Sequence, residues 1–350
     1  MWNRKRAYPK INAEACKSPE VKRSPGLWRC LYGNLGYVLK ACALIFFCFS
    51  ALCACAKSEL EARIDESKAS IERFASLGYT ENLALQVLTL GKPTIDDKIY
   101  LDNINDDLHI IISSKTTNDF NCKLKLMIDY VETDFIIDSK TLNSYVFPVK
   151  SSDALEIVVN LPDSLKFDHH RILTAIVIPN SDIHVSDGYS DIIPALAKDF
   201  ELIPSRSEEG SISVNSNPDY PVRFLDIQYQ GLMLNSDLEL SSTAHYPHRS
   251  LEAKGESVKV GYYAGNYDNS DDMLILLLLN GESILIHDKP FIHLINEPGK
   301  IAYGVIEFKT PEVPGKYELT GFVTKSPYQT RNRENATYYD ASIPFTIIVD

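Results

Sequence analysis

The loop between residues 266 and 272 places oxygen-bearing side chains at alternate positions, which is the chemistry that a calcium ion needs. The loop lacks the Gly and the distal Glu of the usual helix-flanked calcium loop, so carboxylates such as those of Glu282 or Asp288 would have to converge on it. Asp and Asn are also common between strands because their side chains bond their own backbone, and this turn chemistry competes here and at residues 102–107. The candidate ligands are Asn266, Asp268, Ser270 and Asp272.

Tyrosines gather in the second half of the chain, where exposed rings could stack on sugars or anchor a protein interface. The competing explanation is that half of them belong to the core and the others are scattered over the surface. The candidates for a binding platform are Tyr262, Tyr263, Tyr267, Tyr328, Tyr338 and Tyr339.

The sequence carries no local motif of a catalytic site. Gly-x-Ser-x-Gly, His-Glu-x-x-His and a phosphate-binding Gly-rich loop are all absent, and no Cys-x-x-Cys lies outside the apolar run over residues 41–56. Histidine pairs such as His169-His170 come without the second pair that a tetrahedral zinc site requires. We therefore expect a protein that is not an enzyme, and calcium is the one cofactor left open.

Charge divides the chain into two parts. Residues 1–40 hold nine Lys or Arg and two acids, a net charge of +7, so the formal total of −12 leaves −19 on residues 41–350. The second part is too acidic for a nucleic-acid partner. Between the basic and acidic parts lies an uncharged run over residues 41–56, which is short for a spanning helix and typical of the apolar part of a signal peptide. The flanking charges place residues 1–40 in the cytoplasm and the remainder outside it.

The end of this run, Leu52-Cys-Ala-Cys55, resembles the lipobox of bacterial lipoprotein precursors. The resemblance implies lipidation at Cys55 and a bacterial cell-envelope location, although Cys53 departs from the usual residue at its position. An uncleaved anchor helix is the alternative, and both readings tether the chain to a membrane. Six of the seven cysteines lie at or before residue 55, so disulfides cannot stabilise the exported part, and Cys122 is expected to be a small buried hydrophobe.

Hydrophobic periodicity predicts a mainly β protein after a short helix. Residues 57–84 are expected to form a helical stalk, with the amphipathic pattern running to Leu77. Two antiparallel sandwiches follow over 85–200 and 218–350, because short β-branched runs alternate with Asp, Asn, Ser and Pro. The polar segment 201–217 is expected to be a linker, and Asn280-Gly281 is a strong signal for a type I′ hairpin turn.

The two sandwiches look like a diverged duplication. A strand, a Pro-acid corner and a second strand with Leu-Thr recur at Leu155–Val177 and Val305–Val323. The segment around Tyr317, Pro-Gly-Lys-Tyr-Glu-Leu-Thr, resembles the strand entry of immunoglobulin-like modules such as fibronectin-type and CARDB-like domains. The resemblance implies that the Tyr317 hydroxyl closes a corner on a backbone carbonyl. Arg171 occupies the matching position of the first repeat, so its corner would be built differently.

These observations predict a membrane-anchored, non-catalytic binding or structural lipoprotein whose partner is a protein or a cell-wall glycan. Two alternatives stay open. One is a carbohydrate-binding accessory subunit of a secreted hydrolase, which would need coplanar exposed tyrosines. The other is a calcium-dependent adhesin, which would need further carboxylates beside Asp268.

Overall fold

A computed structural model gives the fold of the chain from residue 57 onward. The predictions for the leader, the apolar run and Cys55 concern residues outside those that the model describes. The described residues are 57–69, 82–92, 94–95, 97–116, 118–179, 195–205, 223–225, 231–238, 250–265, 272–295, 297–325, 327, 339–342 and 344–350. Within these ranges, no helix combines the length and the apolar character needed to cross a membrane.

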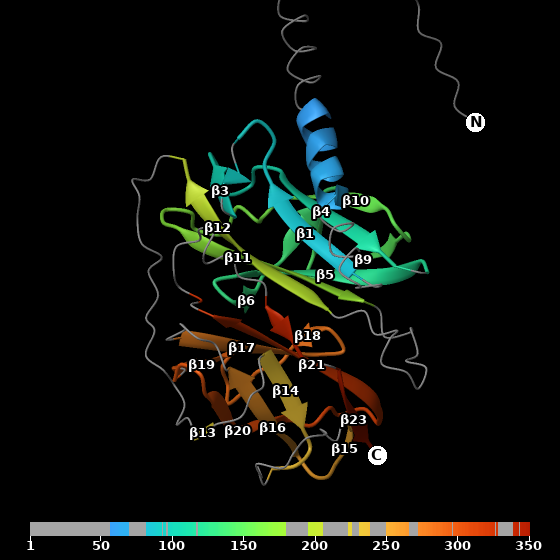
Figure 1. Cartoon of the computed structure of the whole chain (residues 1–350), viewed down its shortest axis with the longest axis vertical. Coiled ribbons are helices and arrows are strands. Elements are labelled where there is room, and N and C mark those ends of the chain that lie inside the picture. The colour runs from blue at the N-terminus through green and yellow to red at the C-terminus, as the bar shows by residue number, and fades with distance from the viewer. Residues whose placement is uncertain are drawn as a thin grey trace, which may run out of the picture. The chain divides into compact units, whose positions relative to one another are not determined.

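The fold is mainly β, with two tandem antiparallel immunoglobulin-like sandwiches that follow a helix described over residues 57–69 (Figure 1). The helix is shorter than expected, since the segment predicted to be helical up to residue 84 is already strand at Asn82. The second sheet of the first sandwich likewise continues through Glu201 to Pro204, so four residues of the expected linker are strand.

The first sandwich has a three-stranded sheet and a seven-stranded sheet. The three-stranded sheet has the order β1-β4-β10 and the other has β2-β3-β12-β11-β5-β6, with β9 also paired to β5. A small hairpin, β7-β8, accompanies them. The strands are β1 (Asn82–Leu88), β2 (Thr94–Ile95), β3 (Lys98–Leu101), β4 (Leu108–Lys115), β5 (Phe120–Ile128), β6 (Val131–Glu132), β7 (Phe135–Ile137), β8 (Lys140–Leu142), β9 (Tyr145–Val149), β10 (Ala154–Val159), β11 (Arg171–Pro179) and β12 (Leu196–Pro204).

The second sandwich repeats this plan. Its four-stranded sheet has the order β13-β20-β16-β14, and its seven-stranded sheet has β15-β23-β21-β17-β18, with β19 paired to β17 and β22 to β21. The strands are β13 (Arg223–Leu225), β14 (Gly231–Asn235), β15 (Ser250–Ala253), β16 (Ser257–Gly265), β17 (Asp272–Leu279), β18 (Glu282–Ser283), β19 (Ile292–Ile295), β20 (Ile301–Lys309), β21 (Gly315–Lys325), β22 (Asp340–Ala341) and β23 (Phe345–Val349).

Strand pairing shows how closely the two halves correspond. The pairs between described strands are antiparallel except β3 with β12 and β15 with β23, which occupy the same place in the two sandwiches. In each half the strand before the hairpin pairs with the hairpin's second strand and with a later edge strand, as β5 does with β6 and β9 and β17 does with β18 and β19. The apolar core of each sandwich lies between its two sheets.

Candidate functional site

The seven-stranded sheets of the two sandwiches pack against each other (Figure 1). Two clusters of polar groups lie on this contact face, one around Lys125 and one around Asp199. Its apolar part comes from β5, β11 and β12 on one side and from β17 and β21 on the other. Strands β11 and β17 are therefore buried on both faces, which explains why their sequences are apolar runs without alternation. The central residues are Met127, Ile172, Ile176, Ile178, Leu274, Leu276, Leu278 and Phe322.

Lys125 is the centre of an ionic cluster at one side of this face. It is fully buried, and its Nζ lies 2.6 Å from Glu132 Oε1 of its own sandwich and 2.6 Å from Glu282 Oε2 of the other. Lys123 Nζ donates to Glu282 Oε1 and to the Asn280 carbonyl, each at 3.1 Å. Burial would raise the pKa of Glu282, but the hydrogen bonds and positive charge of the two lysines outweigh it and lower that pKa.

Asp199 is the acceptor of a second, hydroxyl-rich cluster on the same face. Its Oδ1 accepts hydrogen bonds from Thr174 at 2.6 Å and from Tyr339 at 2.9 Å, and its Oδ2 lies 3.2 Å from the Tyr130 hydroxyl. The Tyr130 hydroxyl also contacts the Pro327 carbonyl oxygen. Because Tyr339 and Pro327 belong to the second sandwich, this carboxylate helps to hold the sandwiches together.

Two equivalent hairpin turns complete the contact. Asn280 and Gly281 have φ of 49° and 75°, which confirms the type I′ turn predicted from their sequence. The first sandwich has the same turn at Asp129 and Tyr130, with φ of 51° and 67°. Tyr130 packs edge-on against Phe291 of the second sandwich, with ring centroids 6.0 Å apart, so each turn reaches the opposite half.

The asparagine or aspartate of each turn ties its hairpin to the neighbouring strand in the same way. Asn280 N donates to the Glu318 carbonyl at 2.7 Å, and its Oδ1 accepts from Glu318 N at 2.7 Å. Asp129 makes the same two bonds with Ile172, at 2.8 and 2.9 Å. This matching geometry is what a duplicated module would retain.

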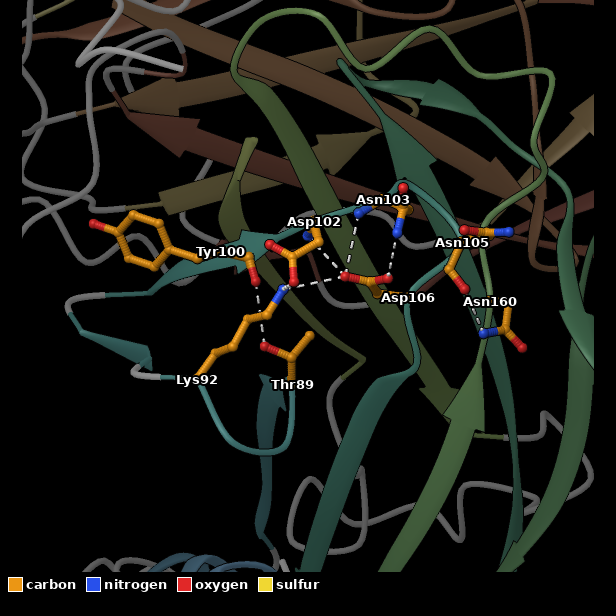
Figure 2. A network of polar contacts seen from close by, with 8 residues as sticks. All are labelled: Thr89, Lys92, Tyr100, Asp102, Asn103, Asn105, Asp106 and Asn160. Atoms are coloured by element: carbon orange, nitrogen blue, oxygen red, sulfur yellow. Dashed lines mark hydrogen bonds and ion pairs between the residues drawn. The ribbon is translucent and has the colours of Figure 1, made fainter. Parts of the chain in front are cut away.

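The acidic segment 102–107 forms a loop closed on itself and on one lysine (Figure 2). Asp106 Oδ2 accepts the backbone N–H groups of Asp102 at 2.8 Å and Asn103 at 3.3 Å, and Lys92 Nζ lies 2.9 Å from Asp102 and 3.2 Å from Asp106. Burial would raise the pKa of Asp106, but these donors lower it. Hydrogen bonds between Asp106 and the backbone of its own turn account for this acidic loop, which is the alternative to calcium binding given above.

The candidate calcium loop is described only at its last residue. Asn266, Asp268 and Ser270 lie outside the described residues, and Asp272 Oδ1 lies 3.2 Å from Nε2 of the buried His293. Glu282, a carboxylate that a calcium site would have recruited, is engaged with Lys123 and Lys125 instead. Within the part of the chain that the structure describes, no three His, Cys, Asp or Glu side chains lie close enough together to hold a metal ion.

The tyrosine platform needs correction at the three positions that the structure describes. Tyr262, Tyr263 and Tyr339 are 0%, 2% and 5% exposed, so no sugar can stack on their rings. Tyr262 points into the core over Gly304, and Tyr339 belongs to the Asp199 cluster. The other three candidates, Tyr267, Tyr328 and Tyr338, lie outside the described residues.

In each sandwich, a side chain at the start of a central strand donates a hydrogen bond to a backbone carbonyl four or five residues earlier in the chain. Tyr317, at the start of β21, donates its hydroxyl to the Val313 carbonyl at 2.7 Å, while its ring packs against the core. Arg171, at the start of β11, donates Nη2 to the Lys166 carbonyl at 3.1 Å and pairs through Nη1 with Asp129. The same corner is thus made by a hydroxyl in one repeat and by a guanidinium in the other.

Cys122, His109 and His170 are buried in the first sandwich, where they have structural roles. Cys122 is fully buried, and this burial raises the pKa of its thiol to about 12, so it is not a nucleophile. His170 Nδ1 lies 2.7 Å from the buried Glu201, and His109 Nδ1 lies 2.5 Å from Glu156. His169, next to His170 in the sequence, contacts the exposed Asp168.

Sequence reasoning did not identify Lys125, Asp199 or Tyr130 as contact residues. A signal was available, because continuous apolar runs such as Leu274–Leu278 are typical of strands covered on both faces. An apolar run in the sequence does not identify the part of the protein that covers the second face of its strand.

No protein-family model and no curated protein matches the chain by sequence. Among solved structures, the chain is similar to red sea bream transglutaminase at 8% identity and a TM-score of 0.22, over 77% of this chain and 31% of that one. It is also similar to the calcium binding domain CBD12 of CALX1.1 (6% identity, TM-score 0.21, 65% and 77% of the two chains) and to CBD12 of CALX1.2 (8%, 0.20, 67% and 79%). The chain therefore spans about a third of the length of the transglutaminase.

Proposed function

We propose that the chain is a membrane-anchored, extracytoplasmic, non-catalytic lipoprotein of the bacterial cell envelope that binds a protein partner. The observation that carries the proposal is the helix over residues 57–69. Its described part starts at Lys57, next to the apolar run in the sequence, and contacts the first sandwich through Glu59, Ser67 and Lys68. An anchor joined in this way to two mutually packed sandwiches suits a protein that holds a binding surface at a fixed place.

A protein partner is favoured over a glycan by the exposed apolar side chains. Val146 of β9 is 58% exposed and Ile295 of β19 is 46% exposed, and these edge strands occupy equivalent places beside β5 and β17. Val131 and Leu285 add to the exposed apolar surface of the same hairpin regions. Edge strands with exposed apolar residues can accept a further strand, whereas three of the tyrosines proposed for a glycan platform are buried.

The intact mass of the membrane-extracted chain tests the anchor. We expect a mature chain that begins at a diacylglyceryl-modified Cys55, and we expect Cys55→Ala to remain unprocessed. An unprocessed parent chain would make the protein a single-pass protein and would refute lipidation.

Site-specific photo-crosslinking in the bacterial host tests the partner. A photoreactive residue at position 146 or 295 should give a protein adduct of defined mass, while the exposed position 252 serves as the control. Absence of an adduct, together with sedimentation of the purified chain with cell walls, would favour the glycan.

A further inference from the structure

The helix over residues 57–69 lies along one outer sheet of the first sandwich and has contacts near both of its ends. Near its start, Glu59 Oε2 accepts the backbone N–H of Gly91 at 3.1 Å. Near its end, Ser67 Oγ accepts from Ser113 at 2.7 Å and Lys68 Nζ lies 3.4 Å from Asp153. Figure 1 shows this helix beside β1, β4 and β10.

These contacts define the direction of the helix relative to the sheet. Gly91 follows the end of β1, where Leu88 is opposite His109, whereas Asp153 precedes Ala154, which is opposite Ser113. From residue 59 to residue 68 a helix rises about 13 Å, and from His109 to Ser113 a strand advances about 13 Å. The helix therefore runs in the same general direction as β4, with Glu59 at the His109 end.

Side chains on the outer face of β4 are buried from solvent, although this face points away from the core of the sandwich. Leu108, Ile110 and Ile112 belong to the core cluster, so Ile111 and Ser113 face the other side of the sheet. Nevertheless Ile111 is 0% exposed and Ser113 is 1% exposed. Ser67, at 0% exposure, lies against Ser113, and these two small side chains allow the helix to come close to the sheet.

Two loops lie at the same end of the sheet as the start of the helix. Residues 89–92 follow β1 and residues 102–107 precede β4, and Lys92 joins them through Asp102 and Asp106 (Figure 2). Asn160, which follows β10, bonds the second loop at the Asn105 carbonyl, at 2.9 Å. We call these two loops the near-end loops. The opposite end of the sheet carries Lys150 and Asp153, at least about 13 Å away along the strands.

Cys55 and Glu59 are four positions apart in the sequence, and four residues of chain span at most about 14 Å. A lipid on Cys55 would hold the membrane surface within that reach of Glu59 and therefore of Gly91. Lys92, the lysine of the near-end loops, is paired with Asp102 and Asp106. Electrostatic attraction between Lys92 and lipid headgroups is therefore not the reason that these loops would lie near the membrane.

We propose that the docked helix fixes the orientation of the protein on the membrane, with the near-end loops toward the phospholipid headgroups and the Lys150 end of the sheet away from them. This inference rests on the proposed lipid anchor at Cys55. It goes beyond that anchor because a flexible stalk would tether the same sandwiches without orienting them.

The test uses the full chain, processed in a bacterial host and reconstituted into phosphatidylcholine vesicles that contain a headgroup-linked quencher. A fluorophore is attached to Asn105→Cys at the near end or to Lys150→Cys at the far end, and both positions are exposed. In a chain lipidated at Cys55 the remaining native thiol is the buried Cys122, which does not compete for the label. We expect a large loss of emission at position 105 and a small loss at position 150.

A pair of helix variants tests the role of docking. Ser67→Lys places a charge at the buried contact and should make the losses at the two positions equal, whereas the exposed control Ser58→Lys should leave them unequal. Continued protection of Cys122 from thiol reagents shows that the first sandwich is still folded in Ser67→Lys.

Three results would overturn the inference. If the parent chain floats with the vesicles but its emission at position 105 is quenched no more than at position 150, the orientation is refuted and the lipid anchor is not. Unequal quenching that persists in Ser67→Lys shows that the helix contact does not set the orientation. A chain that fails to float refutes the anchor itself, and the orientation falls with it.

Discussion

Glu282 Oε2 lies 2.6 Å from Lys125 Nζ, and this ion pair joins the two sandwiches. Lys125 is buried, and it keeps a second partner, Glu132, within its own sandwich. The pair across the contact can therefore be removed without leaving a buried charge unpaired, which makes it a clean probe of the contact face.

Glu282→Gln should lower the free energy of unfolding by about 1 kcal/mol at pH 7, a modest value because the Glu282 side chain is half exposed. The pKa of Glu282 is lowered in the folded state, so its stabilisation is present above the ordinary carboxyl range and is lost as pH falls through the lowered value. The difference between parent and variant should thus shrink below about pH 4. Urea unfolding at a series of pH values checks this.

The exposed Glu252→Gln is the matched control for charge alone and should change the stability little. If Glu282→Gln were as stable as the parent at pH 7, the ion pair would contribute nothing to the packing of the sandwiches.

Gly281→Ala should be more destabilising than Gly299→Ala. Both glycines have positive φ, 75° and 72°, so both variants carry the same backbone strain of about 1 kcal/mol. Only at Gly281 would the new Cβ meet the other sandwich, at 3.2 Å from Lys123 Nζ and 3.3 Å from Ile178 Cδ1, whereas Gly299 has open space. Thermal unfolding compares the two, and equal losses would mean that the turn is not pressed against the first sandwich.

Tyr317→Phe should cost about 1 kcal/mol, because it removes the hydrogen bond to the Val313 carbonyl while the ring stays in place. Tyr303→Phe, on a half-buried tyrosine in the same sandwich, serves as the control. Equal stabilities of the two variants in urea would show that the corner bond is not a stabilising one.

Cys122 should resist thiol reagents until the first sandwich unfolds. Its pKa of about 12 keeps it protonated at pH 8, and the reactive species is the thiolate. Residues 56–350 contain this one cysteine, so the rate of modification in increasing urea reports on the first sandwich alone. Rapid modification in native buffer would contradict the burial of Cys122.

Local sequence signals predicted the elements that depend on local chemistry. Asn280-Gly281 forms the expected turn because both of its residues tolerate positive φ. The equivalent turn at Asp129-Tyr130 escaped notice because a tyrosine in that conformation is rare. Its φ of 67° accompanies contacts with Asp199 and Phe291 that no local pattern reveals.

Candidate site residues were harder to predict, since burial depends on what covers a face. Tyr262 and Tyr263 are neighbours on β16 and point to opposite sides of the sheet, so alternation predicts that one of them is exposed. Both are buried. The sequence places a ring on one face or the other but does not say whether that face is later covered.

The sequence by itself determined the β character, the hairpin turn and the duplicated pattern, because strand periodicity and turn residues act over a few positions. Only the tertiary structure decided that the seven-stranded sheets face each other, that Lys125 and Asp199 are enclosed between them, and that the helix lies along β4. These contacts join residues that are up to 197 positions apart, as Tyr130 and Pro327 are. Such pairings depend on the complementarity of whole surfaces, which no local stretch of the chain encodes.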